Sequence, residues 1–575
     1  MNLLPVPRSL DLTGDVVPFR APRKRLDPSL PPQGYVLRID DSGVDLAAAD
    51  AAGTFYGDAT LAQLAHLHQG ALPVGTVRDH PDLEVRGVML DVSRDKVPTM
   101  PTLRALIARL ASWKINQVQL YTEHTFAYRD HPDVHRAASP FTAEEILDLD
   151  AFCSEHHVEL VPNQNCLGHM NRWLAHARYR PLAIAGDGFV DPFGISRAPM
   201  TIEPTDPGSI ALVRNLLAEL LPLFTSRRVH VGLDEAWELP RARMDDFITW
   251  VSDLRALPEL DGREMLMWGD MVAGDPDALA ALPPGVTICE WGYDDWHPFD
   301  DRCAALASAG IPFWVAPGTS SWLSILGRLT NARTNCRNAV EAAVTYGATG
   351  FLITDWGDQG HLQQPIISEP ALAYGAAVSW CLASNADLDL AAALSTHVFD
   401  DPTGRLADAV LALGDTYRLV TPQFPNLATI VTNLYYPQLS VGRGLTAGLT
   451  AEELDVVDRH LGEARRAAGS ADSGRPDGDR LVAETIFSID LVELLVRDAR
   501  WRLRGDGTLG SIAASDRLEL ANDLRDLTDR YRALWLERNR PGGLVDSVAW
   551  LDNLRSAYET GRPDPTWGGL SVATP

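Results

Sequence analysis

The hydrophobic positions between residues 86 and 385 alternate between two patterns. Short apolar runs typical of strands are followed by segments in which apolar residues recur every three or four positions, as on one face of a helix. The strand candidates are 88–92, 117–121, 158–162, 229–233, 265–268, 286–289, 312–315 and 350–354. Helix candidates between them include 100–113, 142–156, 209–224 and 336–346. This alternation predicts an α/β fold, a (β/α)8 TIM-type barrel. An open doubly wound sheet usually has a glycine-rich phosphate turn after its first strand, and none follows here.

The two ends of the chain follow other patterns. Before residue 83, a hairpin pattern at 35–46 precedes helical spacing at 56–67. Beyond residue 385 strand patterns nearly vanish, and amphipathic helices are predicted at 451–468, 480–504 and 515–538. We therefore expect three domains: a small N-terminal α/β accessory domain (1–82), the barrel (83–385) and a C-terminal α-helical domain (386–575). The helical domain should pack on the barrel or on a second subunit, which leaves a homodimer open. In a dimer, the polar segment 535–546 could reach a partner's cleft, although an interhelical loop is the simpler interpretation.

Charge, hydropathy and cysteine spacing exclude several classes of partner, location and cofactor. The chain has 50 Lys and Arg against 77 Asp and Glu, a formal net charge of -27, and the acidic residues are dispersed. This balance disfavours nucleic acid and anionic membranes as partners. The start lacks the pattern of a secretory signal, and no stretch approaches the roughly 20 apolar residues that span a bilayer. The six cysteines show no metal-ligand spacing. We expect a cytoplasmic protein with no metal and no cofactor.

Polar and aromatic residues gather where the predicted strands end, which in a barrel places them around one cleft. They are Tyr121, Glu123, Asn163, Asn165, His169, Asp234, Glu235, Trp268, Asp270, Trp291, Trp314, Trp356 and Asp358. Tryptophan faces stack on sugar rings and carboxylates accept hydrogen bonds from hydroxyls, so the combination indicates carbohydrate. Each residue alone also has a structural explanation, such as a helix N-cap for Asp270.

The consecutive acids Asp234 and Glu235 suit one kind of glycosidase better than others. Ordinary retaining enzymes need two carboxyl groups about 5 Å apart on either side of the scissile bond, and inverting enzymes need a wider gap. Neighbouring residues at a strand end rarely straddle a bond in this way. We expect one carboxyl to act as acid and base while the other orients a nucleophile that belongs to the substrate.

Several segments resemble glycoside hydrolase family 20, the β-N-acetylhexosaminidases. His230-Val-Gly-Leu-Asp-Glu235 resembles the H-x-G-x-D-E motif of that family, and Arg86-Gly-Val-Met-Leu-Asp-Val-Ser-Arg94 resembles the opening of its barrel. Tyr121-Thr-Glu-His-Thr-Phe and Gly232-Leu-Asp-Glu-Ala-Trp are closer to the branch that includes hexosaminidase D and streptococcal-type N-acetyl-β-glucosaminidases. The resemblance covers about residues 30–380 well and the helical tail more loosely.

The resemblance implies substrate-assisted, retaining hydrolysis of small oligosaccharides or glycoconjugates that end in a β-linked N-acetylhexosamine. Glu235 would protonate the glycosidic oxygen and later deprotonate water. Asp234 would orient the 2-acetamido group, whose carbonyl oxygen attacks the anomeric carbon to give an oxazoline. Arg86 would bind hydroxyls of the terminal sugar and close the pocket, which makes the enzyme exo-acting, whereas Arg94 would be structural.

The further substrate-binding candidates are Glu123, His169, Trp268, Trp291, Tyr293, Trp314, Trp356 and Asp358. Tyr293 ranks ahead of Tyr121 as the donor to the acetamido oxygen. One departure from the family pattern is that its acidic stretch appears as Pro162-Asn-Gln-Asn-Cys-Leu-Gly-His169, so Asn165 cannot charge-pair with His169.

Two other classes of protein stay open. A metal-dependent barrel hydrolase would need several histidines at strand ends, and only His169 and His230 lie near one. A catalytically silent carbohydrate-binding protein on the same scaffold is disfavoured by the intact acid pair together with Arg86.

Overall fold

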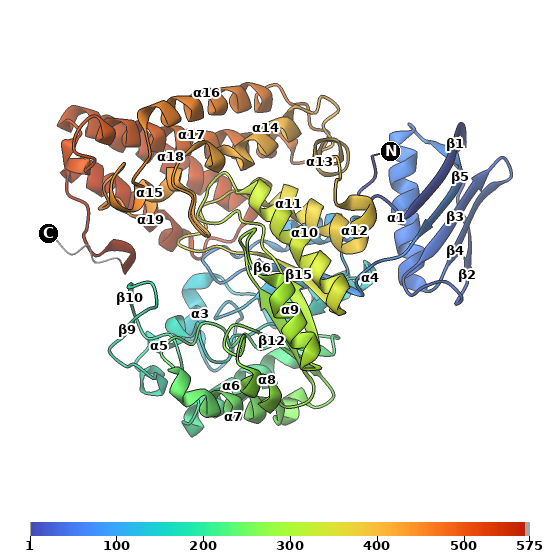
Figure 1. The fold of residues 1–575 in the computed structure, drawn as a ribbon, viewed down its shortest axis with the longest axis horizontal. Coiled ribbons are helices and arrows are strands. Elements are labelled where there is room, and N and C mark those ends of the chain that lie inside the picture. The colour runs from blue at the N-terminus through green and yellow to red at the C-terminus, as the bar shows by residue number, and fades with distance from the viewer. Residues whose placement is uncertain (1, 570–575) are drawn as a thin grey trace.

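The computed structural model describes residues 2–569, and a parallel eight-stranded barrel forms its centre (Figure 1). Its strands are β6 (Val85–Asp91), β7 (Gln117–Tyr121), β8 (Glu159–Val161), β11 (Arg228–His230), β12 (Glu264–Trp268), β13 (Val286–Trp291), β14 (Phe313–Ala316) and β15 (Gly350–Asp355). A parallel bridge between Asn163 and His230 joins β8 to β11 and closes the barrel. The predicted fold class and all eight strand candidates are confirmed.

The outer helices bury the faces that the apolar spacing predicts. They include α2 (Met100–Ser112), α4 (Ala143–Glu155), α6 (Pro207–Leu220), α7 (Met244–Arg255), α9 (Phe299–Ser308), α10 (Leu329–Tyr346) and α11 (Pro365–Trp380). In α2 the buried positions Leu103, Ile107 and Leu110 form one stripe. Helix α10 begins seven residues before the predicted start, because its first turns bury asparagines as well as Leu329 and Ala332, which obscures the apolar spacing. One of the asparagines, Asn335, donates from Nδ2 to the Gly292 carbonyl oxygen at 2.9 Å.

The N-terminal domain is a five-stranded sheet with one helix. Its elements are β1 (Ser9–Pro18), β2 (Arg23–Leu26), β3 (Tyr35–Asp40), β4 (Gly43–Ala48), α1 (Ala51–Leu67) and β5 (Ala71–Asp79), and the strand order is β1-β5-β3-β4-β2. The domain stands at one end of the molecule, with α1 between its sheet and the barrel (Figure 1). The predicted hairpin and helix are present.

A buried charged group joins this domain to the barrel. The Asp79 carboxylate accepts hydrogen bonds from Lys114 Nζ at 2.8 Å, Tyr35 Oη at 2.8 Å and Trp380 Nε1 at 2.9 Å. Lys114 follows α2 and Trp380 ends α11, so one carboxylate ties two barrel helices to β5. Burial lowers the pKa of Lys114 and the charge of Asp79 opposes this effect.

Arg86 belongs to the same junction, and its predicted place in the substrate pocket is wrong. Its side chain is fully buried at the start of β6, the opposite end of the barrel from the strand ends that open to the cleft. The guanidinium donates to the Lys114 carbonyl at 2.9 Å and to Gln33 Oε1 at 2.9 Å, and it lies 4.8 Å from the Trp380 ring centroid. Arg86 therefore holds the two domains together.

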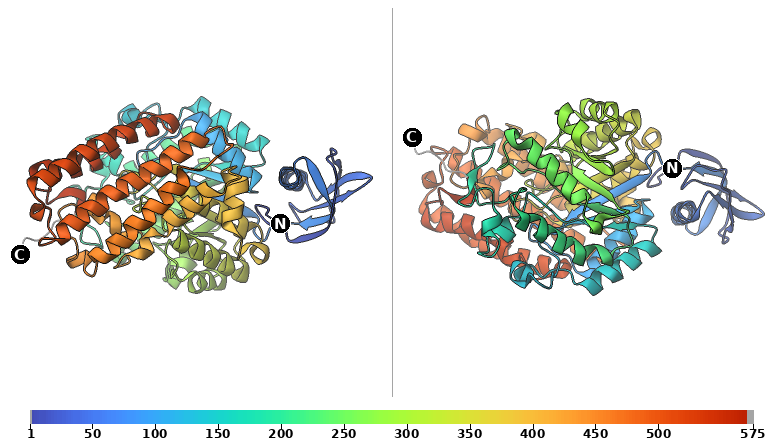
Figure 2. Two further views of the ribbon diagram at one scale, coloured as in Figure 1. Left: turned by 90° about the horizontal axis from the view of Figure 1, so that it is seen from above. Right: turned by 90° about the horizontal axis from the view of Figure 1, so that it is seen from below.

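The C-terminal domain consists mainly of long helices that lie side by side (Figure 2). They are α14 (Arg405–Gly414), α16 (Ala451–Ala468), α17 (Gly478–Leu503), α18 (Ala514–Arg538) and α19 (Leu544–Thr560), with neighbours in contact. The polar segment 535–546 packs on the barrel of its own chain: Arg540 Nε donates to the Pro98 carbonyl and Gly542 N to Ser139 Oγ at 3.0 Å. The segment connects the end of α18 to the start of α19, as the simpler interpretation of the sequence predicts. No helix among residues 2–569 is long and apolar enough to cross a membrane.

We predict that Lys114→Met lowers the free energy of unfolding by about 3–5 kcal/mol, because it leaves the Asp79 carboxylate buried without its counter-charge. Chemical denaturation measures the change. The control is Lys24→Met. It removes an exposed ion pair to Asp58 within the N-terminal domain and should cost less than about 1 kcal/mol. Equal losses for the two variants would contradict a structural role for the buried junction.

Candidate active site

The loops after the barrel strands meet at the end of the barrel away from the N-terminal domain. This mouth contains nine of the predicted site residues, which are Glu123, His169, Asp234, Glu235, Trp268, Trp291, Tyr293, Trp356 and Asp358. The candidate chemistry is therefore concentrated at one end of the barrel.

The acid pair lies on a turn with an unusual backbone. Gly232, Leu233 and Glu235 have φ values of 72°, 76° and 49°, in the left-handed region that non-glycine residues rarely adopt. A Cβ on Gly232 would lie 1.5 Å from Asn165 Oδ1, so only glycine fits there. Such strain persists where the surroundings hold the chain, and here Trp268 N donates to the Gly232 carbonyl at 3.0 Å. The turn brings both acidic side chains to the same side.

His169 lies between the two acids. Its Nε2 is 3.3 Å from Asp234 Oδ2 and 3.4 Å from Glu235 Oε2, and its Nδ1 is 3.7 Å from Glu123 Oε1. Burial disfavours the imidazolium, but the charge of Asp234 and the close contacts of Nε2 with both carboxylates outweigh it and raise the pKa of His169 well above its usual value. Burial opposes ionisation of Asp234 too, yet His169 holds the pKa of Asp234 below its usual value. Asp234 is therefore ionised, and it supplies the countercharge that Asn165 cannot.

Asp270 fixes the Glu235 backbone. Its Oδ2 accepts a hydrogen bond from Glu235 N at 2.9 Å, and its Oδ1 accepts one from Trp291 Nε1 at 3.2 Å. Burial and the nearby charge of Asp234 raise the pKa of Asp270 to about 7. The sequence offered a helix N-cap as the structural explanation of Asp270, but its carboxylate contacts Glu235 and Trp291. The residue positions the second acid and one wall of the mouth.

Arg94, predicted to be structural, is the arginine at the mouth. Its guanidinium lies 3.1 Å from Asp91, 3.5 Å from Glu123 and 3.9 Å from Asp358, measured between nitrogen and carboxylate oxygen. It also lies over the Trp356 ring, 5.2 Å from the centroid. A guanidinium surrounded by carboxylates can donate to hydroxyls while the acids accept from them. The sequence could have identified Arg94 as the mouth residue, because it follows the end of β6, where side chains face the mouth. Arg86 lies at the start of the same strand.

Aromatic rings line the opposite part of the mouth. Tyr293 stacks on Trp291, with 5.1 Å between centroids, and meets Trp322 edge-on at 5.1 Å. Trp356 lies 6.1 Å from Trp268 and 6.4 Å from Tyr293. Trp322 was not predicted, because it lies in the irregular loop after β14, where no periodicity or motif marks it. The five rings form one contiguous aromatic cluster at the mouth, and aromatic faces of this kind can stack on a sugar ring.

Trp314 does not belong to this wall, so its predicted role is wrong. Its Nε1 donates to Thr349 Oγ1 at 3.1 Å, and the Arg228 guanidinium lies over its ring. Arg228 is the first residue of β11, and Thr349 immediately precedes β15. Trp314 fills the barrel interior near the end opposite the mouth.

The two tyrosine candidates differ in what their hydroxyls already contact. Tyr121 Oη donates to Glu123 Oε1 at 3.0 Å and accepts from Asn165 Nδ2 at 2.6 Å. Tyr293 lies half-buried among the aromatic rings of the mouth. Burial raises the pKa of Tyr293 well above its usual value, so its hydroxyl remains a donor.

Helices of the C-terminal domain press on two loops of the mouth. Tyr531 Oη donates to the His361 carbonyl at 3.2 Å, and His361 Nδ1 lies 3.1 Å from the Arg94 carbonyl oxygen. Gly360 has φ +93°, and a Cβ there would lie 2.3 Å from the Trp550 ring. The domain therefore braces the backbone of the loops that carry Arg94 and Asp358.

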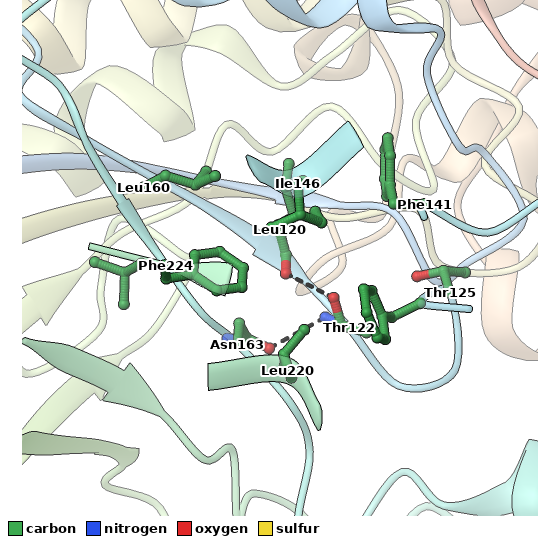
Figure 3. A pocket seen from close by; sticks show the side chains of 11 residues that line it. Leu120, Thr122, Thr125, Phe141, Ile146, Leu160, Asn163, Leu220 and Phe224 are labelled. Atoms are coloured by element: carbon green, nitrogen blue, oxygen red, sulfur yellow. Dashed lines mark hydrogen bonds between the residues drawn. The ribbon is translucent and has the colours of Figure 1, made fainter. Parts of the chain in front are cut away.

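A cavity elsewhere in the barrel is too small for a ligand. It has a volume of about 10 Å³ and lies between β7, β8 and α4, lined mainly by apolar side chains (Figure 3). Thr122 N donates to Asn163 Oδ1 at its edge at 3.1 Å. The space suits about one water molecule. Within residues 2–569, no group of three or more His, Cys, Asp or Glu side chains is arranged to hold a metal ion.

Comparison with known families gives matches over the first two domains. The profile described as "Glycosyl hydrolase family 20, domain 2" matches residues 4–80, and "Glycosyl hydrolase family 20, catalytic domain" matches residues 84–349. Together they match more than half of the 575 residues.

Individual relatives are more distant. The chain is 25% identical to a β-N-acetylhexosaminidase of Cellulomonas fimi over 53% of its length and 62% of the relative's, and 26% identical to a β-hexosaminidase of Akkermansia muciniphila over 46% and 59%. It thus spans less than two thirds of these curated relatives. A solved Streptomyces coelicolor family 20 β-N-acetylhexosaminidase shares the fold with a TM-score of 0.52 and 22% identity, over 66% of this chain and 83% of that one.

We predict that the His169 imidazole stays protonated through neutral pH and that Asp234→Asn lowers its pKa, because the variant removes the countercharge and leaves the burial. Nitrogen-15 NMR titration of the histidine side chains measures both. His124 is an internal control: burial lowers its pKa to about 3, so it should stay neutral over the same range. A His169 signal that titrates identically in the two proteins would contradict the ion pair.

Proposed function

Because the chain belongs to glycoside hydrolase family 20, we propose that it is an exo-acting, retaining β-N-acetylhexosaminidase. The substrates would be small oligosaccharides or glycoconjugates with a terminal β-linked GlcNAc or GalNAc. Catalysis would be substrate-assisted, through an oxazoline intermediate. The Gly232–Trp237 motif and the helical tail support a place near the hexosaminidase D and streptococcal-type branch.

One observation carries the mechanistic proposal. Asp234 is buried and held ionised by His169, yet its Oδ1 accepts no hydrogen bond from any residue in the range 2–569. A buried carboxylate oxygen without a donor is costly unless a ligand supplies one. The N–H of a 2-acetamido group is such a donor, and its positive charge in the oxazolinium would strengthen the interaction.

The terminal sugar would bind with its ring against the aromatic wall. Arg94, Glu123 and Asp358 would hold its hydroxyls, and Tyr293 would donate to the acetamido oxygen. With Arg94, Glu123 and Asp358 holding the hydroxyls of the terminal sugar, the site would accept only a chain terminus, which is the basis for proposing exo action.

The first half of the reaction would cleave the glycosidic bond. The Glu235 carboxyl group donates its proton to the bridging oxygen, the bond from C1 to that oxygen breaks, and the leaving group departs as an alcohol. The acetamido carbonyl oxygen bonds to C1 from the opposite face. Asp234 stabilises the charge that develops on the resulting ring.

The second half would restore the acid. The Glu235 carboxylate takes a proton from water, the water oxygen bonds to C1, and the bond from C1 to the carbonyl oxygen breaks. The acetamide is regenerated, Glu235 is protonated again, and two inversions give net retention.

We predict that the wild-type protein hydrolyses an aryl N-acetyl-β-glucosaminide equally with and without EDTA.

Glu235→Gln should lower kcat by about 10²–10⁴-fold because it removes the proton donor. Asp234→Asn should lower kcat by about 10²–10³-fold and weaken binding of a thiazoline mimic of the intermediate.

The matched control is Glu144→Gln on the exposed face of α4, which should leave turnover unchanged. Activity lost with EDTA and restored by a divalent ion would favour a metal-dependent hydrolase. Sugar binding without turnover would favour a silent binding protein. Near-normal rates in either acid variant would refute the role given to that residue.

A further inference from the structure

A short hairpin stands beside the mouth, at the side of the barrel away from the N-terminal domain (Figure 1). It is formed by β9 (Phe189–Val190) and β10 (Ser196–Arg197). The buried Asp191 carboxylate accepts hydrogen bonds from Phe193 N at 2.9 Å, Ile195 N at 2.8 Å and Arg197 Nε at 2.8 Å. One carboxylate thus holds the backbone of the tip in a defined conformation.

The tip presents an aromatic ring to solvent. Phe193 is 72% exposed, and its ring meets the Trp237 ring edge-on with 6.0 Å between centroids. The Arg197 guanidinium lies over the same tryptophan, 5.8 Å from its centroid. An exposed phenylalanine forgoes the free energy of burial, and the hydrogen bonds of Asp191 tie down the loop that carries it. A single exposed apolar residue is common on protein surfaces. Here the ordered loop and the contact with Trp237, which lies on the turn of the acid pair, point to a binding surface.

The aromatic pair adjoins the proton donor. Trp237 lies two residues after Glu235, and its backbone N–H donates to the Glu235 carbonyl at 2.7 Å. The acid that protonates the bridging oxygen must lie next to that oxygen, so the leaving group extends past the acid and out of the closed pocket. Trp237 lies on the same short turn as Glu235, which places the aromatic pair on the side of the mouth where the acid stands.

We propose that Phe193, Trp237 and Arg197 form a subsite for the first sugar of the leaving group. The C–H face of a pyranose stacks on the exposed ring of Phe193, the partly buried Trp237 supports that ring from the side, and Arg197 donates to the sugar hydroxyls. This inference rests on the proposed hydrolysis and adds a preference for glycosides whose leaving group is itself a sugar.

The test compares two substrates that share the terminal sugar. In N,N′-diacetylchitobiose the leaving group is a pyranose, whereas in methyl N-acetyl-β-glucosaminide it is too small to stack. We predict that Phe193→Ala lowers the ratio of kcat/KM for the disaccharide over the methyl glycoside by about three- to tenfold, mainly through KM for the disaccharide. Trp237→Ala should lower the ratio at least as much, and Phe193→Trp should keep it near the wild-type value.

Val190→Ala, at an exposed position of the same hairpin, is the control and should not change the ratio. Thermal melting by circular dichroism verifies that each variant is folded. An unchanged ratio in both alanine variants, with the wild type cleaving both substrates, overturns the subsite and leaves the proposed function intact. A wild-type protein that cleaves neither substrate overturns both.

Discussion

The ion pair between His169 and Asp234 is the interaction on which the site depends. Two acids that are adjacent in sequence would otherwise repel each other in a desolvated pocket, and one would tend to take up a proton. The imidazolium, 3.3 Å and 3.4 Å from their carboxylate oxygens, stabilises the charge of Asp234. Asp234 can thus keep its negative charge although it is buried, as its proposed role beside the substrate amide requires.

The domains on either side of the barrel serve this site from opposite ends. At the closed end, Asp79 and Arg86 use buried hydrogen bonds to fix the N-terminal domain to the starts of the strands. At the mouth, Trp550 and Tyr531 of the helical domain hold the loops that carry Asp358 and Arg94. A site assembled from several loops needs such support, because small displacements of polar groups weaken the interactions that orient a substrate.

The barrel was predictable from sequence because each strand and helix has its own hydrophobic period, and strand ends in a barrel converge on one face. That rule placed Asp234, Glu235, His169 and Glu123 together. It failed for Trp314, and the family resemblance failed for Arg86. Both residues lie near the strand starts, where side chains point to the closed end or fill the interior. The loop residue Trp322 and the brace at Gly360 arise from tertiary contacts, which no local pattern encodes.

The central claim is that Asp234 steadies an amide that the substrate supplies. It is tested most directly by comparing kcat/KM for two aryl β-glycosides that differ only at C2, one with the acetamido group and one with a hydroxyl. The account predicts ready cleavage of the first and loss of cleavage of the second, because the hydroxyl cannot form the cyclic intermediate. Comparable rates on the two glycosides would contradict it.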